Sequence, residues 1–136
     1  MTGVGSGSVP PGPGEAPCLL PNAALARVDE EKVTGYLLNP DHPRGASKAR
    51  FFVQFGFARH QWEALAEAMK SHARSNHVAQ VVESEFGTRY TVIGPLSTPS
   101  GRKPIVATVW VIGTGTKNPR LVTAYPEKKV EDDQGT

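Results

Sequence analysis

Residues 39–55 read NPDHPRGASKARFFVQF, a stretch in which a proline-bounded turn, a group of basic side chains and a run of aromatic side chains follow one another. Ser47 is the predicted N-cap of a short helix over 48–55, because its hydroxyl can accept a hydrogen bond from an unpaired amide of the first turn. In that helix Lys48 stands at the edge of an apolar face formed by three phenylalanines at helical spacing. This helix is therefore expected to carry basic side chains next to side chains of the hydrophobic core.

The charge of the stretch is one-sided. No acidic residue stands between Asp41 and Glu63, whereas several basic or histidine residues do: His42, Arg44, Lys48, Arg50, Arg59 and His60. A helix N-terminus carries partial positive charge, so with Lys48 and Arg50 beside it this site suits an anion. The alternative is that these are ordinary solvated cations on the outer face of an amphipathic helix.

Two further helices are predicted on either side of this one. Asp29 is the predicted N-cap of the first, whose opening turn carries Glu30 and Glu31, both favourable near the positive end of the helix dipole. This helix ends before Pro40, because the residue preceding a proline is pushed out of the helical region. A longer helix is predicted over about 59–75, where apolar side chains recur every three or four residues.

The second half of the chain has the pattern of strands. From Val78 the hydrophobic period changes from about 3.6 to 2, and turns rich in glycine and proline separate the apolar runs. The pattern predicts four strands, over 78–84, 89–96, 105–112 and 120–125. Short connections favour antiparallel pairing of consecutive strands. The predicted fold class is α+β, with the N-terminal helices packed on one face of a four-stranded antiparallel meander sheet.

The chain has 136 residues, 38% of them hydrophobic, which is enough for one hydrophobic core. Residues 1–18, rich in glycine, serine and proline, are expected to form a disordered linker, 19–126 a single domain, and 127–136 a polar tail. The segment 20–126 holds 13 lysines and arginines against 8 acidic residues, a difference of +5. This basic balance suits an anionic partner.

Several kinds of site are not expected. The single cysteine, Cys18, can form neither an intramolecular disulfide nor a cysteine-based zinc site. No apolar run approaches the roughly 20 residues that cross a bilayer, and the N-terminus lacks the features of a signal peptide, so a soluble domain is expected. The histidines do not show zinc-binding spacing and residues 86–126 contain no carboxylate, so neither a metal nor another cofactor is expected.

The remaining polar residues suit the cleavage of a phosphodiester without a metal. That reaction needs a group for proton transfer, cations to stabilise a pentacoordinate phosphorane, and hydroxyls to position the substrate, while RNA supplies the attacking 2′-hydroxyl itself. The candidate catalytic residues are His42, Lys48, Arg50, Thr123 and Tyr125, and the candidate substrate-binding residues are Arg44, Arg89 and Arg120. The alternative assigns His42 to a solvated turn, and Thr123 and Tyr125 to ordinary strand positions.

The chain resembles an uncharacterised bacterial domain family over nearly all of 20–126. Four motifs occur in the order found in that family: LPNA at 20–23, YLLNPDHPRG at 36–45, KARFF at 48–52 and RLVTAYP at 120–126. Helices followed by a sheet that ends in a Thr-x-Tyr-Pro strand also resemble the metal-independent ribonuclease toxins of the barnase, EndoU, colicin and RelE group. That group usually carries a histidine in its first helical segment, where Ser47 stands beside Lys48 here.

The second resemblance implies an endoribonuclease toxin that cuts RNA, with tRNA as one candidate, by attack of the 2′-hydroxyl. It carries over to Lys48, Arg50, Thr123 and Tyr125, and more weakly to His42; either His42 or Lys48 is expected to move protons. Such domains sit at the C-terminal end of secreted toxins and act in the cytoplasm, and an acidic immunity or antitoxin protein is their expected partner. The competing hypothesis is a non-enzymatic basic module that docks an acidic protein.

Overall fold

The computed structural model describes residues 19–127. The linker predicted over 1–18 and, apart from Glu127, the polar tail predicted over 127–136 lie outside this part of the chain. Within it, none of the helices is both long and apolar enough to cross a membrane.

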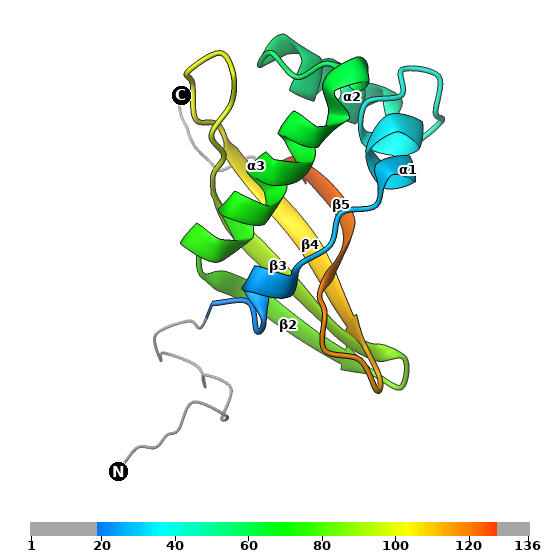
Figure 1. Ribbon diagram of the computed structural model, residues 1–136, viewed down its shortest axis with the longest axis vertical. Coiled ribbons are helices and arrows are strands. Elements are labelled where there is room, and N and C mark those ends of the chain that lie inside the picture. Colours follow the sequence, from blue (N-terminus) through cyan, green and yellow to red (C-terminus); the bar gives the residue numbers. More distant parts are fainter. Residues whose placement is uncertain (1–18, 128–136) are drawn as a thin grey trace.

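A four-stranded antiparallel sheet forms the second half of the fold, with its strands in sequence order (Figure 1). The strands are β2 (Val78–Ser84), β3 (Gly87–Pro95), β4 (Ile105–Gly113) and β5 (Arg120–Pro126). All four predicted strands and the predicted meander are therefore confirmed. A short parallel bridge between Arg27 and Arg120 adds the N-terminal segment to the free edge of β5.

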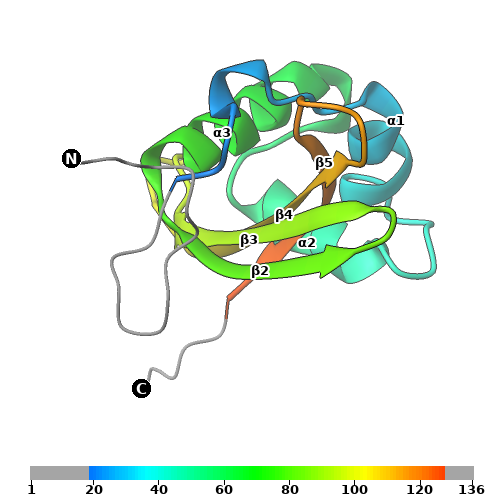
Figure 2. The same cartoon turned by 90° about the horizontal axis from the view of Figure 1, so that it is seen from below.

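The helices lie in the first half of the chain. They comprise α1 (Glu30–Lys32), which continues into a π-helical turn (Val33–Leu37), α2 (Ala46–Gln54) and α3 (Trp62–Ser75), with short 3₁₀ turns at Ala23–Leu25 and Arg59–Gln61. Figure 2 shows α1 and α3 on the same side of the strands. The α+β fold class, with helices packed against the sheet, is confirmed.

The core lies between α3 and the facing side of the sheet. Leu65 and Met69 on α3 are fully buried, and so are Val106 and Trp110 on β4. The α3 residue His72 contacts β4 directly, because its Nδ1 lies 3.1 Å from the hydroxyl of Thr108. The even-numbered residues of β4 therefore face α3, and the odd-numbered residues face the opposite side of the sheet.

The start of α2 differs from the prediction. Ser47 is exposed and lies inside the helix, while Gly45 takes the N-cap position without any side-chain cap. A Cβ atom at Gly45 would collide with the carbonyl oxygen of Tyr36. Close contact between two backbones decides where α2 begins, so the preference of serine for helix starts is overridden.

Asp29 does precede α1 with the extended backbone of an N-cap, as predicted, but its side chain makes no capping hydrogen bond. The carboxylate instead lies 3.4 Å from the guanidinium of Arg27. The helix itself widens into the π turn after only three residues, which hydropathy periodicity does not reveal.

Candidate active site

Tyr36 lies at the centre of the candidate site. It belongs to the π-helical turn, and its hydroxyl forms a 3.0 Å hydrogen bond with Oγ1 of Thr123 on β5. This bond joins residues 87 positions apart in the chain, and thus ties the helical layer to the last strand. The Tyr36 side chain is partly exposed, so groups around it remain accessible to a ligand.

Two lysine ammonium groups lie close to the Tyr36 ring. The Nζ atom of Lys32 is 5.5 Å from the ring centroid and that of Lys48 is 5.6 Å from it. Both distances are within the range of cation–π attraction. Neither lysine forms an ion pair with an acidic residue of 19–127, where the ion pairs are Arg27–Asp29 and Lys70–Glu67. Two ammonium groups without an ion-pair partner among the described residues are a suitable arrangement for binding an anion, although Asp29 and Glu31 line the same pocket.

His42 packs against the same ring from the turn before α2. The two ring centroids are 4.9 Å apart in an edge-on arrangement. Nδ1 of His42 accepts hydrogen bonds from the backbone amides of Arg44 and Gly45, both at 3.0 Å. The neutral ring therefore carries its hydrogen on Nε2, and His42 presents a hydrogen-bond donor.

Three of the five candidate catalytic residues thus meet at Tyr36, namely His42, Lys48 and Thr123. Tyr125 lies two residues beyond Thr123 on the same face of β5 and is 36% exposed. Arg50 is exposed and lies on the far side of α2, because residues two apart on a helix point about 200° from each other. Arg50 is therefore not brought to Tyr36 by the helix.

The candidate substrate-binding residues lie on three different elements. Arg44 is exposed in the turn before α2, where its carbonyl oxygen lies 3.5 Å from Nζ of Lys48. Arg120 lines a pocket of about 400 Å³ together with Tyr36 and Lys32. Arg89 lies across the sheet, in register with Val111, which also lines that pocket.

A β-bulge in β5 puts Arg120 and Thr123 on the same face of the sheet. Thr123 pairs with Val109 and Arg120 with Val111, and the register shifts between these pairs. Without the extra residue, positions three apart in a strand would point to opposite faces. The bulge therefore aligns the arginine with the hydroxyl that holds Tyr36.

Neither Tyr36 nor Lys32 is among the candidate site residues predicted from the sequence. The available signal was their spacing, since residues four apart lie on the same side of a helix. A tyrosine at the border of an apolar face is also a common way to present a polar group at a surface.

Among residues 19–127, no group of three or more histidine, cysteine, aspartate or glutamate side chains could hold a metal ion.

The fold is similar to that of a chain in a solved structure, a contact-dependent growth inhibition toxin–immunity protein complex from Klebsiella pneumoniae 342. The TM-score is 0.62 and the sequence identity 16%, over 79% of this chain and 97% of that chain, which shows a shared fold. No curated protein matches the sequence. A family model described as a domain of unknown function (DUF6883) matches residues 19–128, and the chain therefore belongs to this family.

Proposed function

We propose that this protein is a metal-independent endoribonuclease that acts as a toxin effector. The observation that carries the proposal is the convergence on Tyr36 of groups from separate segments: two ammonium groups, an imidazole Nε2–H donor and the Thr123 hydroxyl. None of these groups is a carboxylate, although Asp29 and Glu31 line the same pocket as Tyr36 and Lys32. Such a set can bind a phosphodiester and stabilise added negative charge.

In the proposed reaction the 2′-hydroxyl of RNA gives its proton to solvent water while its oxygen attacks the adjacent phosphorus, the bond to the 5′-oxygen breaks, and a cyclic phosphate remains. The phosphorane formed on the way carries extra negative charge, which the ammonium groups of Lys32 and Lys48 stabilise. Lys48 also donates a proton to the leaving 5′-oxygen. His42 donates its Nε2–H to a phosphate oxygen, because accepting a proton on Nδ1 would break two hydrogen bonds to backbone amides.

Thr123 and Tyr36 orient the substrate in this scheme. Their mutual hydrogen bond leaves each hydroxyl with further capacity to bind an oxygen of the substrate. Tyr125 and Arg120, on the same face of β5, extend the contact surface along the strand. Arg50 is proposed to act outside this centre, through contact with a more distant part of the RNA.

The toxin part of the proposal is supported by the fold similarity to a chain of a toxin–immunity protein complex. A cognate acidic immunity protein would cover the basic site and prevent self-poisoning. The domain would be delivered as the C-terminal part of a secreted protein and would cut RNA in the cytoplasm of the target cell.

The first experiment incubates the purified protein with total RNA and with tRNA in the presence of EDTA. We expect cleavage products that carry a 2′,3′-cyclic phosphate, and no cleavage at a nucleotide whose 2′-hydroxyl is replaced by hydrogen. Lys48→Ala should abolish cleavage, whereas Lys103→Ala, an exposed lysine in the connection between β3 and β4, should not. Intact RNA after incubation with a protein that arrests growth in cells would refute the ribonuclease.

The alternative is a basic module without catalytic activity that docks an acidic protein. It is favoured by one observation, which is that Arg44, Arg89 and Arg120 are all exposed and could serve as a docking surface. Expression in bacteria separates the two functions. A ribonuclease should arrest growth unless its immunity protein is supplied, and Lys48→Ala should relieve the arrest, whereas a docking module should be tolerated in either form.

A further inference from the structure

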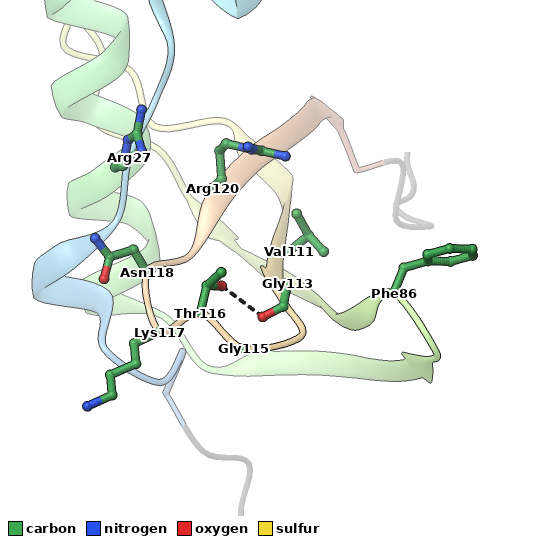
Figure 3. A pocket seen from close by; sticks show the side chains of 9 residues that line it. All are labelled: Arg27, Phe86, Val111, Gly113, Gly115, Thr116, Lys117, Asn118 and Arg120. Carbon is green, nitrogen blue, oxygen red and sulfur yellow. Dashed lines mark hydrogen bonds between the residues drawn. The ribbon is translucent and has the colours of Figure 1, made fainter.

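A second pocket, of about 620 Å³, opens beside the first, and nine residues line it (Figure 3). Its polar side chains include Arg27, Lys117, Asn118 and Arg120, and no carboxylate lines it. Val111 and Arg120 also line the pocket that contains Tyr36, so the two pockets adjoin. A ligand bound at Tyr36 can therefore continue into the second pocket.

The backbones of two arginines that line this pocket are paired with each other. Arg27 and Arg120 are partners in a parallel bridge, fixed by hydrogen bonds from the Arg27 amide to the Pro119 carbonyl (2.8 Å) and from the Leu121 amide to the Arg27 carbonyl (3.0 Å). Their side chains carry like charges, whose repulsion an anion bound between them would offset. Arg27 has a partial partner in Asp29, at 3.4 Å, but Arg120 forms no ion pair with the acidic residues of 19–127.

An exposed aromatic ring marks the other end of the pocket. Phe86, in the turn between β2 and β3, is 78% exposed and is the most exposed large hydrophobic side chain of the described residues. Figure 3 shows it at the opposite end of the pocket from Arg27 and Asn118. Phe86 also lines a smaller pocket of about 220 Å³ together with Arg89 and Val111. The ring does not contribute to the core, but it offers a flat apolar surface beside cations.

We propose that this second pocket is a nucleotide subsite for single-stranded RNA, in which Arg27 and Arg120 hold a phosphate and Phe86 stacks on a base. The subsite rests on the proposed ribonuclease function and adds a second phosphate position beside the one at Tyr36. Cations that follow the backbone and an aromatic ring that stacks on bases are the two elements of single-strand binding. An acidic protein surface would use the cations but has no need for the exposed ring, so RNA is the partner these observations favour.

Binding is measured by fluorescence anisotropy with a labelled hexanucleotide of 2′-O-methyl RNA, which cannot undergo attack by the 2′-oxygen. The double substitution Arg27→Gln, Arg120→Gln should weaken binding about tenfold or more and reduce the slope of log affinity against log salt by roughly 0.7 for each phosphate that the protein no longer neutralises. Phe86→Ala should weaken binding at least about fivefold, and Phe86→Trp should restore it. Arg102→Gln, an exposed arginine in the connection at the opposite end of β3 and β4, is the matched control and should change binding less than twofold.

A substitution of Asp29 should strengthen RNA binding, whereas the substitutions above should weaken it. Asn is as good an N-cap as Asp, and the Asp29 side chain makes no capping bond, so Asp29→Asn should leave α1 intact. It frees the Arg27 guanidinium and removes a negative charge beside the pocket. The hexanucleotide should therefore bind about two- to fivefold more tightly, and unchanged or weaker binding would contradict the assignment of Arg27 to a phosphate.

Cleavage separates failure of the subsite from failure of the ribonuclease. A dinucleotide fills only the Tyr36 centre, and Phe86 does not line the pocket that contains Tyr36, so Phe86→Ala should cut a dinucleotide like wild type and should cut a hexanucleotide more slowly. Hexanucleotide binding that is unchanged both in Phe86→Ala and in the double arginine variant, with cleavage by wild type intact, would overturn the subsite alone and assign these arginines to the binding of an acidic protein. Arginine-dependent binding without any cleavage by wild type would instead overturn the ribonuclease and keep the subsite.

Discussion

The candidate site depends on a single phenolic hydroxyl. Tyr36→Phe keeps the ring that lies near both lysines and packs on His42, and removes only the hydrogen bond to Thr123. Loss of this bond should cost about 1 kcal/mol of stability, as for a typical partly buried hydrogen bond. If Tyr36 orients RNA, the kcat/KM measured in the cleavage assay should also fall, by about tenfold or more. This is a larger free-energy change than the loss of the hydrogen bond alone. Tyr90→Phe on β3 is the control, and equal losses of activity in the two variants would contradict the role of Tyr36.

A buried histidine gives the protein a pH-dependent stability. Nε2 of His72 lies 3.0 Å and 2.9 Å from the carbonyl oxygens of Gly94 and Val106, and Nδ1 lies 3.1 Å from the Thr108 hydroxyl, which also accepts the Trp110 indole hydrogen. This network satisfies the neutral ring with hydrogen on Nε2. Burial lowers the pKa of His72 below its ordinary value of 6.5, although the two carbonyl oxygens oppose that shift.

The folded state binds the second proton, which would make the His72 ring cationic, less tightly than the unfolded state does. The His72 contribution to stability is therefore complete above pH 6.5 and is lost as pH falls below it. Urea unfolding at pH 7.5, 6.5 and 5.5 should show a falling free energy of unfolding, by at most about 1.4 kcal/mol per pH unit from this group. His72→Gln should reduce that slope and His77→Gln, at an exposed position, should not. A slope that is identical in all three proteins would exclude His72 as its source.

At the scale of elements, the start of α2 determines whether His42 and Lys48 reach Tyr36. Gly45→Ala would press a methyl group against the Tyr36 carbonyl and push the two segments apart. We expect a loss of about 1–3 kcal/mol in the free energy of unfolding, as for other overpacked sites, together with reduced cleavage. Gly35→Ala, in the π turn, meets nothing within 4 Å and is the matched control, which should keep both stability and activity. Full activity of Gly45→Ala would show that this contact does not position the site.

The elements differ in how far the sequence predicts them. The strands follow from a period of 2 with clear turns, and α3 from apolar residues at helical spacing, because burial of one face decides both. The centre at Tyr36 depends on features without such a pattern: the π turn, the Gly45 contact and the bulge that aligns Arg120 with Thr123. His42, Lys48 and Thr123 were identified by their chemistry, whereas the tyrosine that joins them is ordinary by composition and is recognised only from its contacts.

At the scale of the whole molecule, the core of the described residues lies within the predicted domain over 19–126. The buried hydrophobic residues run from Leu20 to Ala124, and the segment before α1 contributes Leu20, Ala26 and Val28. That segment also pairs with β5 through Arg27. Because the sequence predicts a linker over 1–18 and a polar tail over 127–136, we expect a chain of residues 19–127 to melt at the same temperature as the full protein.

A chain that begins at Glu30 should behave differently, because it lacks those three buried side chains and the bridge to β5. Burial of one leucine or valine is worth about 1.5–3 kcal/mol, so the loss should reach roughly 3–6 kcal/mol, a large part of the stability of a small domain. Thermal unfolding of the two shortened proteins measures this directly. The same melting temperature in both would show that the segment is peripheral to the fold, and Arg27 would then lack the fixed position that the second pocket requires.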